Sequence, residues 1–178
     1  GLHGRARRGQ VPRVRRLRPL TAAPVQIREV ASIADIDPAA WNALAGTDCP
    51  FLRHEFLAAL EATGCVGGRT GWDPLHLVAH DSAGRLAGAV PAYLKQHSWG
   101  EFVFDFAWAQ AYSRSGLSYY PKLLAAVPFS PVNGPRLLLR PDLAGGELVA
   151  LLADALVAVT RRRELSSAHA LFVGDQDR

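Results

Sequence analysis

The chain has 178 residues, of which 49% are hydrophobic and 20% are charged, and its formal net charge is +4. This length and composition are typical of one globular domain with a sizeable core. The chain contains no apolar run near 18 residues and no apolar signal core at its start. We therefore predict neither a transmembrane helix nor a secretory signal, and we expect a cytoplasmic location.

The positive charge is concentrated at the start of the chain. Seven of the 20 Lys and Arg residues lie in residues 1–24, which hold no acid, so 13 basic residues face 16 acids in the rest. The Arg-, Gly- and Pro-rich composition predicts a disordered tail over residues 1–24 and a mildly acidic domain over residues 25–178. The tail suits contact with nucleic acid, which is one functional alternative, and an extension without a role is another.

The first part of the domain predicts one strand and two helices. Residues Val25–Val30 alternate between apolar and polar side chains, which is typical of a strand. Asp37 and Pro38 are typical of the start of a helix. A second helix is expected over Arg53–Ala62, followed by a glycine-rich connecting loop over residues 64–72.

Three further strands are expected next. Leu75–His80 and Leu86–Leu94 are apolar runs joined by the turn residues 81–85, a pattern that predicts a hairpin. Residues 101–108 alternate strictly, so we predict a third strand with Asp105 on its polar face. Four aromatic side chains share the other face and are expected in the core: Phe102, Phe104, Phe106 and Trp108.

A strand with a break follows. Leu123–Phe129 is apolar, and a second apolar run, Leu137–Leu139, comes after a turn that contains Asn133 and Gly134. Prolines on both sides of this pair prevent a regular ladder, so backbone groups at the break are expected to need another partner. A ligand is one candidate for that partner.

The last predicted elements complete the fold class. Leu148–Val159 has a strongly helical apolar pattern, and Ala168–Val173 is expected to be a strand. The order of the elements predicts an α+β fold, with a mixed, mostly antiparallel sheet flanked by helices.

Three segments resemble the FemAB-like family, whose members are described as peptidoglycan biosynthesis or recognition proteins. They are PFLRHEFLAALEATGCVGGRTGW (residues 50–72), DPLHLVAHDSAGRLAGAVPAYLKQHSWGEFVFDFAWAQAY (73–112) and YYPKLLAAVPFSPVNGPRLL (119–138). The resemblance implies the fold of the GCN5-related N-acyltransferase (GNAT) superfamily, expected to be incomplete at the C-terminus. It also implies transfer of an acyl or aminoacyl group to an amine of a peptidoglycan precursor or another small molecule.

The resemblance also implies where the acyl donor lies. In the superfamily the donor lies between two splayed strands and its phosphates rest on a helix N-terminus, which is a suitable anion site. The donor would be acyl-CoA or, as for Fem relatives, aminoacyl-tRNA, which makes tRNA a possible partner. The matching donor-binding residues are Val127, Phe129, Asn133, Gly134, Gly145 and Gly146. Asp142 and Glu147 place acids beside that site, which motivates a non-catalytic recognition module as the alternative function.

Transfer to an amine needs a base for the amine proton and hydrogen-bond donors for the oxyanion. Asp105 and Glu101 are the candidate bases. The candidate acids or hydrogen-bond donors are Tyr112, Tyr119, Tyr120 and Asn133. Of these, we predict Asp105, Tyr112 and Tyr120 to be catalytic.

No metal site is predicted. His76 and His80 share a strand face without a third ligand at zinc-site spacing, and Cys49 and Cys65 do not form a CxxC motif. We expect both cysteines to be reduced thiols.

Overall fold

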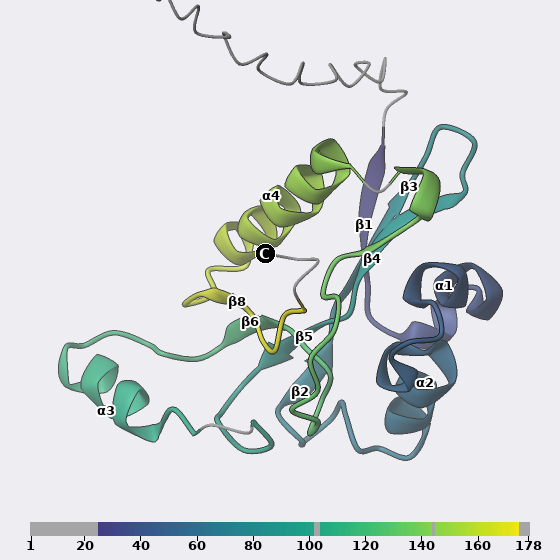
Figure 1. The fold of residues 1–178 in the computed structure, drawn as a ribbon. Helices are drawn as coiled ribbons and strands as arrows, with labels where there is room; N and C mark the ends of the chain where they lie inside the picture. The colour runs from purple at the N-terminus through teal and green to yellow at the C-terminus, as the bar shows by residue number, and fades with distance from the viewer. Residues whose placement is uncertain (1–24, 102–103, 144, 175–178) are drawn as a thin grey trace, which may run out of the picture.

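The structure is a computed structural model that describes residues 25–101, 104–143 and 145–174 (Figure 1). The predicted basic tail, residues 1–24, lies outside the described residues, as does Phe102.

Two four-stranded sheets share one long hairpin. The first sheet has the order β1-β3-β4-β7 and the second has the order β2-β5-β6-β8. The strands of the first sheet are β1 (Gln26–Val30), β3 (His76–His80), β4 (Leu86–Val90) and β7 (Leu138–Leu139). Those of the second are β2 (Trp72–Pro74), β5 (Ala92–Lys95), β6 (Lys122–Ala125) and β8 (Ala168–Ala170). Only Leu75 separates β2 from β3, and only Pro91 separates β4 from β5. The ladder is interrupted at Pro91 because a proline has no backbone N–H to donate.

All strand pairs are antiparallel except β6 and β8, which are parallel neighbours. The α-helices are α1 (Pro38–Ala45), α2 (His54–Ala62), α3 (Phe106–Arg114) and α4 (Gly146–Arg162). Three short 3-10 helices are Ile33–Asp35, Pro50–Leu52 and Pro141–Leu143. Helices α1 and α2 cover one face of the first sheet and α4 covers the other (Figure 1).

Successive side chains of β3 point to opposite faces of the sheet, so they pack in two separate hydrophobic cores. Val78 packs in one core with Trp41 of α1, whereas Leu77 packs in the other core with Leu152 of α4. The expected α+β fold, with mostly antiparallel strands flanked by helices, is confirmed.

Local sequence signals placed several of these elements correctly. The Asp37 carboxylate accepts a hydrogen bond from the Ala40 N–H at 2.7 Å and so caps α1, as predicted. The Asp81 carboxylate accepts hydrogen bonds from the Ala83 and Arg85 N–H groups at 3.0 and 2.9 Å, which closes the predicted hairpin turn.

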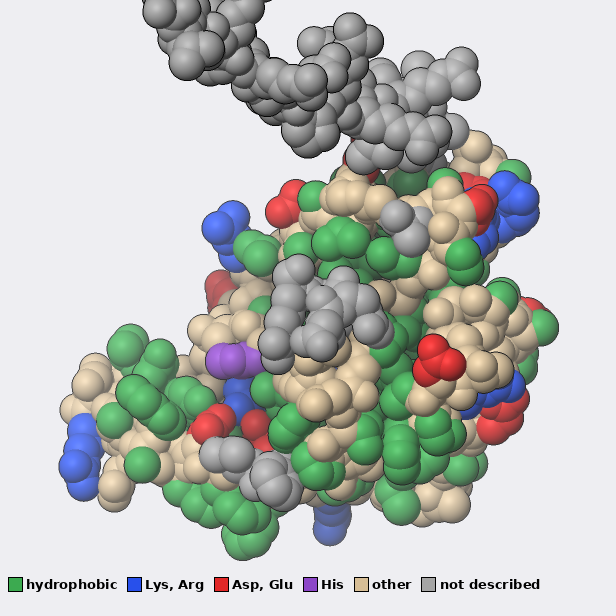
Figure 2. Space-filling model, in the orientation of Figure 1, with side chains coloured by type: hydrophobic (Ala, Val, Ile, Leu, Met, Phe, Trp, Pro, Cys, Tyr) green, Lys and Arg blue, Asp and Glu red, His purple; other side chains and the backbone are tan. Residues whose placement is uncertain are grey.

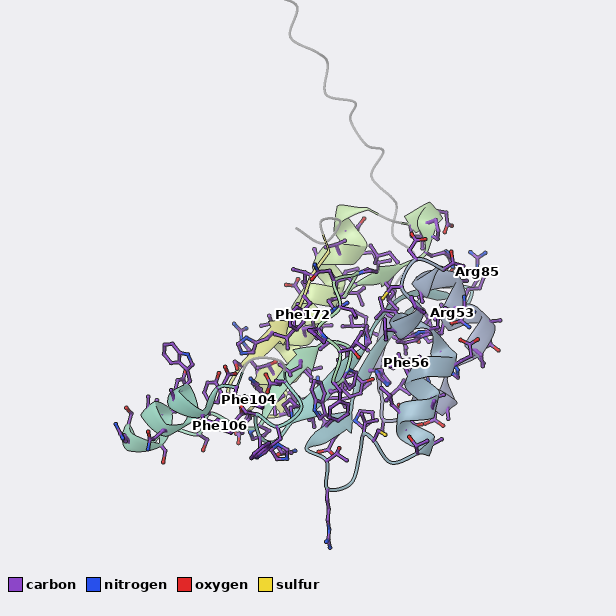
Figure 3. All side chains as sticks on the ribbon, turned by 60° about the horizontal axis from the view of Figure 1, so that its bottom comes forward. Arg53, Phe56, Arg85, Phe104, Phe106 and Phe172 are labelled. Carbon is purple, nitrogen blue, oxygen red and sulfur yellow. The ribbon has the colours of Figure 1, made fainter. Side chains whose placement is uncertain are left out.

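The predicted strand over residues 101–108 is wrong, since α3 begins at Phe106. The predicted aromatic core is also wrong at three described positions, because Phe104, Phe106 and Trp108 are 52%, 49% and 64% exposed. Helix α3 has no buried residue and lies on an arm that extends from the sheets (Figures 1 and 3). Its aromatic rings contact one another instead, and Phe104 stacks on Phe106 with centroids 5.2 Å apart. The alternation in this segment therefore does not reflect a sheet.

The predicted break in the apolar strand is confirmed, and its backbone finds partners within the chain. The Gly134 N–H donates to the Phe172 carbonyl at 3.1 Å, and the Gly174 N–H donates to the Gly134 carbonyl at 2.9 Å. The buried Arg136 guanidinium donates to the Leu171 carbonyl at 2.6 Å. At Gly134, the segment after β8 therefore supplies the partner for which a ligand was one candidate.

Candidate functional site

A pocket of about 430 Å³ lies between the α3 arm and the ends of β6 and β8. Its lining comes from three separate segments: Glu101, Asp105, Trp108, Tyr112, Tyr119, Lys122, Ser167, His169, Leu171 and Phe172. Figure 2 shows blue, red and purple side chains side by side here, between the green side chains of the arm and the rest of the molecule. Charged and aromatic groups therefore converge in one hollow.

Lys122, the first residue of β6, is the centre of this charge cluster. It is 2% exposed, and its Nζ lies 2.6 Å from Asp105 Oδ2 and 3.0 Å from Glu101 Oε2. The ammonium also lies over the rings of Tyr119 and Tyr120, 5.2 and 5.3 Å from their centroids. A buried cation needs such partners, because desolvation of an unpaired charge is very costly.

Asp105 is held in place by its neighbours on both sides. Its N–H donates to the Ser98 hydroxyl at 2.7 Å, and that hydroxyl lies 2.6 Å from the Tyr120 hydroxyl. The Tyr119 hydroxyl donates to Asp105 Oδ2 at 2.9 Å. Asp105 precedes α3 but does not cap it through its side chain, so its carboxylate turns toward Lys122.

The surroundings shift the pKa values of three titratable groups at the pocket in different directions. Burial raises the pKa of Glu101 above its usual range. Burial also disfavours the Asp105 carboxylate, but hydrogen bonds from Lys122 and Tyr119 outweigh it and lower the pKa. Partial desolvation in the pocket and the nearby Lys122 ammonium lower the pKa of His169, which favours the neutral imidazole.

His169 lies on β8, beside β6 in parallel register. Its Nε2 lies 2.8 Å from the Ser167 hydroxyl, which orients the ring at the edge of the pocket. The pocket therefore combines a carboxylate with a depressed pKa, a neutral imidazole and a buried ammonium.

The three residues predicted to be catalytic occupy different places. Asp105 and Tyr112 line the pocket. Tyr120 does not line the pocket. Its hydroxyl shares a hydrogen bond with the Ser98 hydroxyl, which in turn accepts from the Asp105 N–H. The structure thus brings two of the predicted residues to one cavity and places the third as their support.

The predicted donor-binding residues are also divided. Val127 and Phe129 line a narrow crevice that adjoins the pocket. The other four line neither cavity: Asn133, Gly134, Gly145 and Gly146.

Sequence reasoning missed Lys122, Ser167 and His169. A lysine directly before an apolar strand was a weak signal, because a lysine is almost never fully buried unless it is paired. Ser167 and His169 gave no comparable signal, since only the parallel pairing of β8 with β6 brings them to the pocket.

Within the described part of the chain, no group of three or more His, Cys, Asp or Glu side chains could hold a metal ion. Across the same residues, every helix is too short or too polar to cross a membrane.

Comparison with known proteins identifies the family. The sequence model of the FemAB-like family, described as peptidoglycan biosynthesis/recognition, matches residues 32–178. The chain therefore belongs to the FemAB-like family, as the sequence predicted. No curated protein matches the chain significantly.

Two solved structures are similar to this one. A Trypanosoma brucei acetyltransferase is 17% identical, with 83% of this chain and 82% of that chain covered and a TM-score of 0.44. A mutant protein from Bacillus halodurans is 12% identical, with 82% and 80% covered and a TM-score of 0.42. The family assignment rests on the family model alone.

Proposed function

We propose that this domain transfers an acyl or aminoacyl group to an amine of a peptidoglycan precursor. The family description supports the link to peptidoglycan. The observation that carries the proposal is the pocket that the Asp105 carboxylate lines together with the aromatic residues Trp108 and Tyr112. A carboxylate and aromatic faces both attract an ammonium group, which is the form in which an amine acceptor arrives.

The acceptor must lose a proton before it can attack a carbonyl carbon. His169 suits this step because it lines the same pocket and its lowered pKa keeps the imidazole unprotonated. In this scheme Asp105 holds the ammonium and His169 takes its proton. The neutral nitrogen forms a bond to the carbonyl carbon, and the thioester or ester bond of the donor breaks. The nitrogen loses a second proton as the amide forms, so one of the two protons goes to the leaving group and the other is released to solvent.

Lys122 has a positioning role in this scheme. It fixes Asp105 and Glu101 at 2.6 and 3.0 Å and keeps the Asp105 carboxylate ionised. The donor would be acyl-CoA or aminoacyl-tRNA, since the pocket offers a place for the amine that both reactions share.

The test is a transfer assay with the full chain, labelled acetyl-CoA or alanyl-tRNA, and a precursor peptide that carries a free amine. Asp105→Asn should raise KM for the peptide, and His169→Gln should lower kcat by about 10²-fold or more. Asp48→Asn and His80→Gln are matched controls outside the pocket and should behave like the wild type. No transfer from either donor would contradict the proposal, as would wild-type rates in both pocket variants.

Recognition without transfer is the second candidate function. It is favoured by the pairing of Gly134 with the segment after β8, which occupies backbone groups that a donor was expected to use. Saturable binding of the peptide, abolished by Asp105→Asn and without turnover of either donor, would select this candidate.

A further inference from the structure

Ser167 and His169 form a hydrogen-bonded pair on the wall of the pocket, and acyl transfer as proposed uses only the histidine. Ser167 Oγ lies 2.8 Å from His169 Nε2, and both residues line the pocket. They are two positions apart on an extended segment, so their side chains lie on the same face. A hydroxyl held against an imidazole is the arrangement that activates a serine as a nucleophile.

The backbone around Ser167 is fixed to the neighbouring strand. The Leu123 N–H donates to the Ser167 carbonyl at 2.9 Å, and the Ser166 N–H donates to the Pro121 carbonyl at 2.9 Å. Strand β8 then runs beside β6, as Figure 1 shows. The segment is therefore anchored on both sides of Lys122, the first residue of β6. This anchoring places the Ser167 hydroxyl at a defined position relative to the charge cluster.

The Ser167 hydroxyl is accessible and has a base beside it. Ser167 is half-buried and His169 is exposed, so a donor carbonyl can reach the pair. In the tautomer with its proton on Nδ1, the imidazole accepts at Nε2 from the hydroxyl. Partial desolvation and the Lys122 ammonium lower the pKa of His169, which favours the neutral ring that this role needs.

The adjacent serine differs in both respects and offers an internal comparison. The Ser166 hydroxyl donates to the Tyr119 carbonyl at 2.5 Å, and Ser166 does not line the pocket. A carbonyl cannot take up the hydroxyl proton as an imidazole can. Of the two neighbouring hydroxyls, only that of Ser167 is therefore set up to attack a carbonyl carbon.

The negative oxygen that forms in such an attack needs a hydrogen-bond donor, and the backbone offers one next to Ser167. The Ser167 carbonyl and the Leu171 N–H both bond to β6, so alternation turns the Ala168 N–H away from β6. Among the described residues, no strand pairs with that edge of β8. The Ala168 N–H is therefore available to an oxygen bound beside Ser167.

We propose that Ser167 is a nucleophile that carries the acyl group as an ester between the donor and the amine, with His169 as its base. The inference rests on the proposed function and divides its transfer into two displacements. The place of the acceptor is unchanged, because Asp105 lines the same pocket and holds the ammonium.

Both displacements balance. In the first, Ser167 Oγ forms a bond to the carbonyl carbon and its proton passes to His169. The bond from carbon to the leaving sulfur or oxygen breaks, and the leaving group takes that proton. In the second, the ammonium loses a proton to His169, the nitrogen attacks the ester carbon, and the bond to Oγ breaks. Oγ takes the proton back from His169, and the second proton of the nitrogen is released to solvent as the amide forms.

The direct test traps the acyl group on the protein. The full chain is incubated without an amine, with acetyl-CoA, with alanyl-tRNA, or with p-nitrophenyl acetate, which needs neither a CoA site nor a tRNA site. Trypsin releases residues 164–178 as one peptide, because Arg163 and Arg178 are successive cleavage points. Mass spectrometry should place one acyl group on Ser167. No acyl group on Ser167 with any of the three reagents would overturn the inference.

Four variants separate a nucleophile from a structural serine. Ser167→Ala should leave this peptide without the acyl group, whereas Ser166→Ala should be acylated like the wild type. Ser167→Cys keeps a nucleophile at the same place and should form a thioester there. His169→Gln should slow acylation of Ser167 by about 10²-fold or more. Acylation of His169→Gln at the wild-type rate would contradict the role of the imidazole.

A chase experiment separates this inference from the proposed function. The acylated chain, freed of donor, is mixed with the precursor peptide, and the acyl group should move to the peptide amine. Transfer by Ser167→Ala at the wild-type rate would refute the nucleophile and leave acyl transfer intact as a direct reaction. An acyl group on Ser167 that passes only to water would support the nucleophile and contradict the proposed function.

Discussion

Replacing Lys122 by methionine should destabilise the domain in a strongly pH-dependent way. The substitution removes the ammonium that lies between Glu101 and Asp105 and keeps an apolar stem of similar length. The Glu101 side chain is 5% exposed, so its carboxylate would be buried without a cation. Asp105 is 22% exposed and can be solvated instead.

The magnitude follows from the protonation of Glu101. A buried carboxylate without a cation takes up a proton, and holding that proton costs about 1.4 kcal/mol per pH unit above the unfolded pKa. From the ordinary value of 4.5, the cost is at most about 1 kcal/mol at pH 5 and at most about 5 kcal/mol at pH 8, because the raised pKa of Glu101 in the wild type already carries part of it. Removal of one partner of a buried ion pair typically costs about 3–5 kcal/mol, which agrees.

Urea unfolding followed by circular dichroism at pH 5 and pH 8 measures both values. The double variant Lys122→Met with Glu101→Gln should show a loss that no longer depends on pH. Arg85→Met, which breaks an exposed ion pair with Asp81, should cost at most about 1 kcal/mol. An equal loss at both pH values, or a loss below about 1 kcal/mol at pH 8, would refute the reasoning.

Three further results are expected. Trp108→Ala should change the free energy of unfolding by no more than about 0.5 kcal/mol because Trp108 is exposed. Trp41→Ala in the core should lower it by about 3–5 kcal/mol, and equal losses in the two variants would support a buried aromatic core after all. Burial lowers the pKa of Lys95 to about 8 from 10.5, so between these pH values the unfolded chain binds more protons than the folded chain. The free energy of unfolding should therefore rise with pH, by up to about 2 kcal/mol from pH 8 to 9.5. A rise that persists in Lys95→Gln would show that another group causes it. A thiol reagent should label the exposed Cys65 quickly and the buried Cys49 only on unfolding; two fast thiols would contradict this core.

Local signals were sufficient for elements that carry their own start and stop residues. Asp37 and Pro38 define the start of α1, and the apolar pattern over Leu148–Val159 defines α4, because caps and periodicity act within a few residues. The hairpin between β3 and β4 was readable for the same reason.

The segment around Asp105 could not be read in this way. Its alternation fits a strand, but among the described residues no strand pairs with it, and the alanine-rich run that begins at Phe106 forms a helix instead. Helix propensity thus outweighed the alternation, and the aromatic side chains were left on the surface.

The candidate site was predictable only in part for a related reason. Asp105 and Glu101 lie on one segment, so their shared role could be proposed from the sequence. His169 joins them only through the parallel register of β6 and β8, which places Leu124 opposite His169. A parallel pair requires a long crossover, here through α4, and its register leaves no local trace.

The measurement that tests the central claim most directly is transfer of a labelled acyl group to a free amine by the full chain. The account predicts transfer from acetyl-CoA or alanyl-tRNA that Asp105→Asn weakens through KM and His169→Gln weakens through kcat. The absence of transfer from both donors, or transfer that neither substitution changes, would contradict it.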